Sequence, residues 1–284
     1  MVTYRDVFAD TVRRLESAGV DDAPFNAAEL MGSVLGADCR SSRFAQLMEE
    51  TAEPEKLTAL DSLTDRRISG EPLQYIIGEW EFYGVPIKVG SGVLIPRQDT
   101  EALIDITAVK WRGRKSLTVI DLCSGSGCIA CALARTLDCE KIICIEKSEQ
   151  AAEYLKENLA LNHVSAEVII GDVNDPDIIS TVPQADIIIC NPPYLSDEDM
   201  ADLQQEVTYE PREALYGGAD GLEFYRSITR LWKDKLRSGA MLCYEIGIGQ
   251  EDDVMLMLIR HGLTNVRCRE DLRGIVRCVF GFKA

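Results

Sequence analysis

Four consecutive residues, Asn191-Pro192-Pro193-Tyr194, carry the groups needed to hold a flat nitrogen group. They directly follow the apolar run Ala185–Cys190, which predicts a buried strand. Asn191 offers a carbonyl acceptor on a short side chain, and the prolines, which lack an N–H, leave their carbonyls free to face a ligand. Tyr194 adds a ring face and a hydroxyl. These groups could accept both hydrogens of a planar NH2 group; alternatively, the two prolines merely end the strand.

A glycine turn lies upstream of this motif. The β-branched segment Ser116–Leu122 predicts a strand, and it leads through Cys123-Ser124-Gly125-Ser126-Gly127 into an apolar helical segment at Ile129–Ala134. A strand, a glycine turn and a helix form the arrangement in which backbone approaches a nucleoside cofactor closely. The turn alone is a weak signal, because its spacing Gly125-x-Gly127-x-x-Ala130 also fits a dinucleotide-binding turn.

Acidic residues end the next two predicted strands. Glu146 follows Lys141–Ile145 and could accept from both ribose hydroxyls; alternatively, it is a solvated residue that opens a helix. Asp172 and Val173 follow Ala166–Ile170 and could contact an adenine amino group and ring; alternatively, Asp172 only caps the next turn. Because strand carboxyl ends share one edge of an open α/β sheet, we expect all these elements to face one crevice.

The hydrophobic periodicity predicts a helical region followed by alternating strands and helices. The expected helices are Tyr4–Ala18, Phe25–Leu35, Ser41–Glu50 and Glu53–Ser69. Glu79–Val89 alternates around Gly84 and predicts a hairpin. We therefore expect a helical substrate-recognition domain at residues 1–75, a hairpin linker at 76–95 and an α/β domain at 96–284.

The α/β domain is expected to contain a mainly parallel sheet with helices on both faces. Gly239–Ile246 predicts its fifth strand, and Val266–Arg269 and Val276–Phe282 predict a pair of strands at its edge.

The charge balance disfavours a nucleic acid as direct partner. The chain has 30 Lys+Arg against 47 Asp+Glu, a formal net charge of −17, and the excess of acid extends over both parts: residues 1–90 hold 9 basic and 16 acidic side chains, and the rest holds 21 and 31. Neither part carries the basic surface that phosphate neutralisation requires. A protein substrate fits better, although the acidity could also serve only solubility.

The remaining composition favours a cytoplasmic protein. No run of about 18 apolar residues predicts a membrane span, and no signal peptide is evident at the start. Ten cysteines without a secretory signal are expected to be reduced thiols. Cys128-x-x-Cys131 suggests zinc, but His163 and His261 are isolated, so no metal site is expected. We expect a monomer, because no coiled coil is evident.

The site motifs resemble those of a known enzyme family. Asp121–Gly127 resembles the first motif of class I S-adenosylmethionine-dependent methyltransferases, and Asn-Pro-Pro-Tyr resembles the motif of those that methylate amide or exocyclic amino nitrogens. Other segments are similar to the release factor glutamine methyltransferases, the HemK/PrmC family: Pro72–Gly78, Val93–Glu101, Tyr209–Leu215, Gly217–Leu222 and Glu245–Gly247.

The resemblance implies a Rossmann-like methyltransferase fold, with a mainly parallel seven-stranded sheet whose last strand is antiparallel, and an all-α N-terminal domain that helps bind the substrate. It implies that the enzyme acts in translation termination: it methylates the side-chain amide nitrogen of the glutamine in the Gly-Gly-Gln motif of peptide chain release factors. The methyl donor would be S-adenosyl-L-methionine. Alternatively, the N-terminal helices only support the catalytic domain.

The resemblance also assigns residues. S-adenosylmethionine would contact Cys123, Ser124, Gly125, Ser126, Gly127, Glu146, Asp172, Val173 and Asn191. Asn191, Pro192 and Tyr194 would be catalytic, and Asn191, Pro192, Pro193, Tyr194 and Arg97 would bind the substrate. Glu101 is expected to cap or pair within the fold, and Arg212 to be structural.

Four positions depart from the family pattern. Cys123 stands where the family usually has a glycine, and Glu146 where aspartate is common. Gln98-Asp99 replaces the usual Pro-Glu. Cysteine is small and glutamate only one methylene longer than aspartate, so these changes bear on cofactor affinity rather than on the chemistry.

Two other enzyme classes remain possible from the residues. A DNA adenine-N6 methyltransferase would use Asn-Pro-Pro-Tyr on an exocyclic amine, and the acidic composition speaks against it. An NAD-dependent oxidoreductase would use the glycine turn with Glu146, but it leaves Asn-Pro-Pro-Tyr unexplained. A non-catalytic scaffold explains neither motif.

Overall fold

The computed structural model describes residues 2–271 and 273–284, and its contacts divide the chain into two units. The helical unit comprises the residues up to Glu79 together with Gln204–Tyr209, and the sheet unit comprises Trp80–Leu203 and Glu210–Ala284. These contacts assign most of the predicted hairpin linker to the sheet unit. They also assign to the helical unit a segment that lies more than 120 residues further along the chain.

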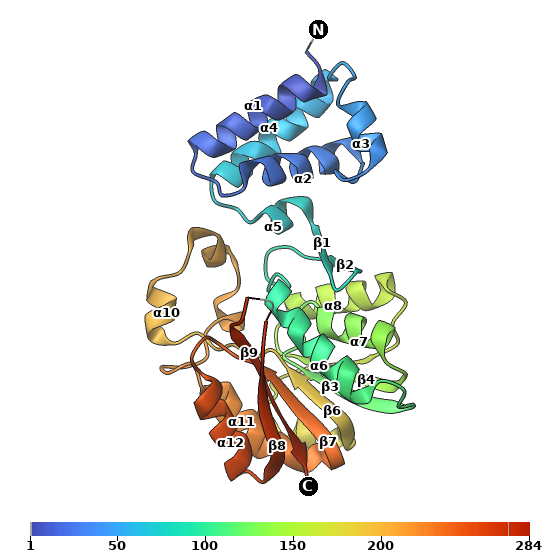
Figure 1. The fold of residues 1–284 in the computed structure, drawn as a ribbon, viewed down its shortest axis with the longest axis vertical. Coiled ribbons are helices and arrows are strands. Elements are labelled where there is room, and N and C mark those ends of the chain that lie inside the picture. Colours follow the sequence, from blue (N-terminus) through green and yellow to red (C-terminus); the bar gives the residue numbers. More distant parts are fainter. Residues whose placement is uncertain (1, 272) are drawn as a thin grey trace. The chain divides into compact units, whose positions relative to one another are not determined.

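The helical unit is built from short amphipathic helices. They are α1 (Tyr4–Ser17), α2 (Ala23–Leu35), α3 (Ser42–Leu47), α4 (Pro54–Ile68) and α5 (Leu73–Ile77) (Figure 1). α1 begins at a capping box formed by Thr3 and Asp6, and α2 and α4 have a proline in their first turn. Leu15 of α1 packs with Ala23 and Ala27 of α2. The four predicted helices are confirmed, with α3 shorter than expected.

The distant segment of this unit contains the 3-10 helix η2 (Gln205–Tyr209). Glu206 forms an ion pair with Arg67, whose side chain is buried, and the Tyr209 hydroxyl donates to the Ser69 carbonyl over 3.0 Å. The segment therefore neutralises a buried charge that would otherwise be costly.

The sheet unit contains a mixed sheet of seven strands. They are β3 (Leu117–Leu122), β4 (Cys139–Glu146), β5 (Glu167–Ile170), β6 (Ala185–Cys190), β7 (Leu236–Glu245), β8 (Leu263–Glu270) and β9 (Val276–Lys283), in the order β5-β4-β3-β6-β7-β9-β8. The pairs from β5 to β7 are parallel, whereas β9 is antiparallel to both β7 and β8. The predicted fold class is thus confirmed, including the antiparallel last strand. β1 (Glu79–Phe82) and β2 (Val85–Lys88) form the predicted hairpin.

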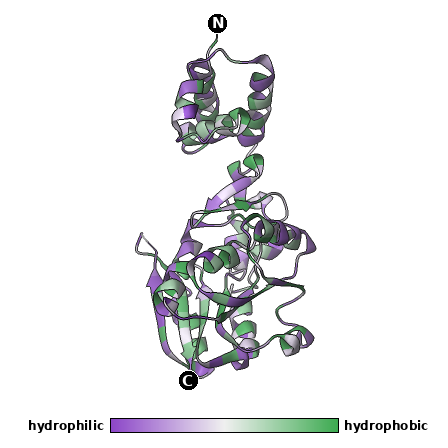
Figure 2. Ribbon diagram, turned by 90° about the vertical axis from the view of Figure 1, so that its right-hand side faces the viewer, coloured by the Kyte–Doolittle hydropathy of each residue, from purple (hydrophilic) through white to green (hydrophobic). Residues whose placement is uncertain are grey.

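Helices cover both faces of the sheet (Figure 1). On one face lie α6 (Glu101–Trp111), α7 (Cys128–Thr136) and α8 (Glu149–Leu161), and on the other lie α9 (Pro176–Thr181), α11 (Glu223–Trp232) and α12 (Glu251–Arg260). Shorter elements are α10 (Asp197–Ala201), η1 (Gln98–Thr100), η3 (Arg212–Ala214) and η4 (Lys233–Lys235). All of β3 is buried, and Figure 2 shows hydrophobic residues along the middle strands. Two-sided burial explains why these strands are continuous apolar runs.

The strand order reverses at β3, which pairs with β4 on one side and with β6 on the other. In open α/β sheets, ligands bind in the crevice outside the carboxyl ends of the strands at such a point. The residues that follow β3 and β6 are the glycine turn and Asn-Pro-Pro-Tyr.

A buried amide side chain connects three elements of the sheet unit. Asn158 of α8 has no exposed surface. Its Oδ1 accepts from the Lys88 N–H over 2.7 Å, and its Nδ2 donates to the carbonyls of Lys88 and Ser126, each over 2.9 Å. Asn158 therefore fixes the hairpin and the glycine turn against α8.

We expect Asn158→Ala to lower the free energy of unfolding by about 2–4 kcal/mol, because it leaves several buried backbone groups without partners. Urea denaturation measures this change. The control is Gln184→Ala, which removes an exposed amide with one bond of 3.2 Å to the Asp234 carbonyl and should cost less than about 0.5 kcal/mol. Equal losses in the two variants would contradict this role of Asn158.

Candidate functional site

A cavity of about 670 Å³, the central cavity, lies at the carboxyl ends of the parallel strands. Six of the nine residues predicted to contact S-adenosylmethionine line it: Cys123, Gly125, Glu146, Asp172, Val173 and Asn191. Ser124, Ser126 and Gly127 are not among the lining residues. Ser124 and Ser126 are buried, and the Ser124 hydroxyl donates to the Asp121 carbonyl over 2.8 Å, so these residues shape the turn from within.

Glu146 is held in place by backbone N–H groups. Its Oε2 accepts from Gly125 over 2.8 Å and its Oε1 from Ser148 over 2.8 Å. The side chain is buried, so the alternative of a solvated helix-opening residue is wrong. Burial raises the pKa of Glu146, and the backbone hydrogen bonds oppose this rise. Each carboxylate oxygen has a second acceptor position, so Glu146 can still accept from a diol in the cavity.

The structure explains why Cys123 is an unusual residue at its position. Its φ is 57°, which lies in the left-handed region that glycine adopts without penalty. A non-glycine residue there costs roughly 1–2 kcal/mol. The Cys123 side chain packs against the core cluster of the sheet, which offsets part of this cost.

Asp172 and Val173 contact both the cavity and the surrounding fold. Asp172 Oδ1 accepts from the Asn174 N–H over 2.8 Å, as the capping alternative predicted, and its Oδ2 lies 3.0 Å from Lys147 Nζ. Val173 is buried, and its carbonyl accepts from Trp232 Nε1 over 2.8 Å. Capping and cavity lining are therefore compatible at Asp172.

The Asn-Pro-Pro-Tyr motif lies between two cavities. Asn191 and Pro193 line the central cavity, whereas Tyr194 lines a second, lateral cavity of about 920 Å³. Two glycines pack against the backbone of the motif: a Cβ on Gly217 would lie 2.7 Å from the Pro193 carbonyl oxygen, and one on Gly221 would lie 2.3 Å from that of Tyr194. Only glycine allows this approach, which gives the Gly217–Leu222 segment a structural role.

Polar contacts fix both ends of the motif. Asn191 Nδ2 lies 3.3 Å from Thr100 Oγ1, and the Tyr194 hydroxyl lies 3.4 Å from Glu245 Oε1. Gln250 Nε2 donates to the Tyr194 carbonyl over 3.0 Å. The motif is thus a supported structure rather than a simple strand end.

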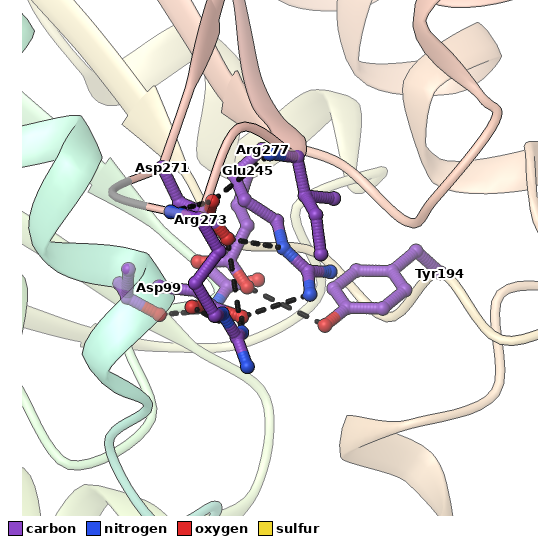
Figure 3. Close-up of polar contacts among 9 residues, drawn as sticks. Asp99, Tyr194, Glu245, Asp271, Arg273 and Arg277 are labelled. Carbon is purple, nitrogen blue, oxygen red and sulfur yellow. Dashed lines mark hydrogen bonds and ion pairs between the residues drawn. The ribbon is translucent and has the colours of Figure 1, made fainter.

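Charged residues line the lateral cavity (Figure 3). Asp99 bridges Arg273 and Arg277 at 3.0 and 2.9 Å, and Arg277 also pairs with Asp271. Asp99, one of the departures from the family pattern, therefore anchors the connection between β8 and β9 to η1.

Arg97, predicted to bind the substrate, also lines the lateral cavity. It forms an ion pair with the buried carboxylate of Glu210, which accepts from the Ile95 N–H over 3.0 Å as well. Glu101 pairs within the fold as predicted, because its Oε1 accepts from the Tyr83 N–H over 2.9 Å.

Several cavity residues had no role in the sequence interpretation. They are Gly92, Val93, Leu94, Lys147, Ser148, Ala151, Pro211, Glu213, Ala214, Tyr216, Gly218, Glu223 and Phe224. Arg212, expected to be structural, lines the cavity too, and its guanidinium lies 4.9 Å from the Tyr216 ring centroid. The only signal in the sequence was the family-like segments around residues 93, 211 and 217.

Asp121, at the end of β3, is fully buried beneath the glycine turn. Neither of its carboxyl oxygens has a hydrogen-bond partner among the described residues. Burial and then the nearby Glu146 raise its pKa to about 8, and Ser124 and the Ala130 amide oppose this only in part. The group is therefore a neutral acid at pH values well below 8.

Two further findings concern metal and membrane. Within residues 2–271 and 273–284, no group of three or more His, Cys, Asp or Glu side chains is arranged to hold a metal ion. In the same ranges, no helix combines the length and the apolar character that a membrane span requires.

Comparisons with known proteins agree with this geometry. Residues 98–220 match the family described as "Methyltransferase small domain", and residues 6–78 match the "PrmC N-terminal domain". The chain is 37% identical over 280 residues to a release factor glutamine methyltransferase of Geobacter sulfurreducens, covering 98% of this chain and 96% of the relative. It is 39% identical to one of Thermodesulfovibrio yellowstonii over 241 residues, covering 82% and 84%.

Solved structures support the fold. A methyltransferase from Pyrococcus furiosus aligns with a TM-score of 0.54 at 18% identity, covering 72% of this chain and 91% of that one. The hMettl16 catalytic domain, solved in complex with an RNA hairpin, aligns with a TM-score of 0.56 at 18% identity, covering 82% and 83%.

The pKa of Asp121 makes stability depend on pH. Because the folded-state pKa of about 8 lies above the ordinary aspartate value of 3.8, Asp121 contributes stability that is fully present below about pH 4 and is lost as pH rises through about 8. Between pH 5 and 7, the free energy of unfolding of the wild type should therefore fall, relative to that of Asp121→Asn, by about 1.4 kcal/mol for each unit by which the pH rises. Denaturant unfolding over this range measures the difference. A difference that does not change with pH would refute the shifted pKa.

Proposed function

Since this chain belongs to the release factor glutamine methyltransferase family, we propose that it methylates the side-chain amide nitrogen of the glutamine in the Gly-Gly-Gln motif of peptide chain release factors. S-adenosyl-L-methionine is the methyl donor. The observation that carries this proposal is that Asn191 and Pro193 line the same cavity as Gly125 and Glu146. An amide-holding motif and a nucleoside-binding edge therefore share one site.

The central cavity fits S-adenosylmethionine in size and in chemistry. Ligand cavities typically measure about 300–1,000 Å³, and this one has a volume of about 670 Å³. We assign Glu146 to the ribose hydroxyls, Asp172 and Val173 to the adenine, and the Cys123–Gly127 turn to the rest of the cofactor. When bound, the cofactor supplies a methyl group on a positively charged sulfur, which is already activated for transfer.

The residues of the chain then have to align a weak nucleophile. An amide nitrogen is weak because its lone pair is delocalised into the carbonyl. We assign one N–H of the substrate amide to Asn191 Oδ1 and the other to the Pro192 carbonyl. These acceptors raise electron density on nitrogen and stabilise the positive charge that develops there. Proximity and orientation can supply roughly 7–11 kcal/mol, so the proton can leave to water without a dedicated general base.

The two other enzyme classes are less consistent with the site. A dinucleotide oxidoreductase gives no role to Asn191 and Tyr194, which the fold supports with several hydrogen bonds. A DNA methyltransferase requires a basic surface, whereas this chain has a formal net charge of −17.

The helical unit extends the proposal to substrate recognition. A release factor is large enough to contact both units, and we assign to the helical unit, including Gln204–Tyr209, part of its recognition. The division into a recognition domain (1–75), a linker (76–95) and a catalytic domain (96–284) stays a prediction, and we assign catalysis to the sheet unit, Trp80–Leu203 with Glu210–Ala284. We place the activity in the cytoplasm, where release factors act.

The direct test is methylation of a release factor by the wild-type chain with labelled S-adenosylmethionine. We expect label on the wild-type release factor and none when the glutamine of its Gly-Gly-Gln motif is replaced, because the cavity residues act on that amide. A release factor with a surface glutamine replaced elsewhere serves as the control and should be labelled normally. Label that survives loss of the motif glutamine would refute the proposed substrate.

Asn191→Ala should reduce kcat by about 10²–10³-fold, the range found when one group that stabilises developing charge is removed. The Kd for S-adenosylmethionine, measured by calorimetry, should change little, because Glu146 and the glycine turn remain. Gln184→Ala, which removes an exposed amide just before the start of β6, at the opposite end of that strand from Asn191, is the matched control. Equal loss of cofactor binding and of transfer would show that Asn191 serves the cofactor instead.

A further inference from the structure

The two ends of the Asn191 amide are chemically different, and only one of them suits the proposed reaction. Oδ1 accepts hydrogen bonds, whereas Nδ2 only donates them. If the amide were rotated by 180°, Nδ2 would face the N–H groups of the substrate amide, and donor would oppose donor. The reaction therefore requires a contact that fixes the orientation of Asn191.

Thr100 provides that contact. It follows Asp99 at the end of η1, and its side chain is buried, with 1% of its surface exposed. Its Oγ1 lies 3.3 Å from Asn191 Nδ2. A hydroxyl has one hydrogen and can also accept, so Thr100 can select Nδ2 only if its own hydrogen is donated elsewhere.

Glu245 is the group that can receive this hydrogen. It ends β7, and its carboxyl is buried, with 1% exposed. The Thr100 hydroxyl lies close enough to this carboxyl to lower its pKa, and the Tyr194 hydroxyl lies 3.4 Å from Oε1 (Figure 3). An ionised carboxylate can only accept. When Glu245 is ionised, a hydroxyl that meets it can only donate to it, and Thr100 is then left to accept from Asn191 Nδ2.

The surroundings of Glu245 are unfavourable for a carboxylate that served stability alone. Its Oε2 has no hydrogen-bond partner among the described residues, which costs free energy in a buried site. The nearby Arg277 forms its ion pairs with Asp99 and Asp271. Burial raises the pKa of Glu245 to about 7; Asp99 adds to the rise, and Thr100, Arg277 and Tyr194 oppose it.

We infer that Thr100 and Glu245 are positioning residues for the methyl transfer. They act through the side chains of the Asn-Pro-Pro-Tyr motif and not by touching the substrate. Thr100 turns Asn191 so that Oδ1 faces the substrate amide, and Glu245 holds the hydroxyls of Thr100 and Tyr194. This inference rests on the proposed function. It predicts that the side chains at the end of β7 and in η1 affect kcat and leave cofactor binding unchanged.

The test compares Thr100→Val, which keeps the shape but removes the hydroxyl, with Thr100→Ser, which keeps the hydroxyl. We expect Thr100→Val to lower kcat for release factor methylation by about 10- to 100-fold, because a misoriented acceptor misplaces the nucleophile. The Kd for S-adenosylmethionine should stay within about twofold, and Thr100→Ser should remain within about threefold of the wild-type kcat.

Thr107→Val is the matched control. Thr107 is also buried in the sheet unit, but its hydroxyl donates only to the Leu103 carbonyl of its own helix, over 2.7 Å. Its kcat should equal that of the wild type. A second variant, Glu245→Gln, places an NH2 group among donors and should lower kcat with an unchanged Kd.

Three results would overturn the inference while leaving the proposed function intact: a wild-type kcat in Thr100→Val, an equal loss in Thr100→Ser and Thr100→Val, or a wild-type kcat in Glu245→Gln. Absence of release factor methylation by the wild-type chain would instead remove the proposed function, and the inference with it.

Discussion

The parallel pairing of β3 with β6 is the constraint on which the rest of the site depends. Its register places Leu122 beside Cys190, so the chain leaves both strands at the same edge. The glycine turn and the Asn-Pro-Pro-Tyr motif follow immediately. Because the strand order reverses at β3, helices diverge to opposite faces and leave a crevice between the two motifs. A shift of this register would separate the nucleoside-binding edge from the amide-holding motif.

The site is built from buried acids in a chain that is already acidic. Asp121, Glu146 and Glu245 lie within the last two residues of β3, β4 and β7 and are all buried, and burial raises the pKa of each. Their partners differ. Glu146 accepts from two backbone N–H groups. In contrast, both carboxyl oxygens of Asp121 and Oε2 of Glu245 have no hydrogen-bond partner among the described residues. Burying carboxyl groups with few partners costs folding free energy, and in this chain these groups lie where a ligand and a reacting group must be held.

Particular residues show how far the sequence could be interpreted. Continuous apolar strands, proline and capping signals, and the alternation of elements predicted the sheet, its helices and the four main helices of the N-terminal region. Departures such as Cys123 were visible in the sequence, but their cause was not. The left-handed φ of Cys123 and the ion pairs of Asp99 with Arg273 and Arg277 depend on backbone geometry and on residues more than 170 positions away.

The sequence by itself determined the fold class, the family and the two motifs. These depend on local periodicity and on short runs of consecutive residues, which can be recognised without knowing the tertiary contacts. Only the tertiary structure decided which side chains support the motifs. Thr100 meets Asn191 across 91 positions, Tyr194 meets Glu245 across 51, and Gln204–Tyr209 joins the helical unit. The physical reason is that a buried polar group bonds to whichever groups lie near it in the folded chain. The spacing of residues along the sequence does not predict which groups these are.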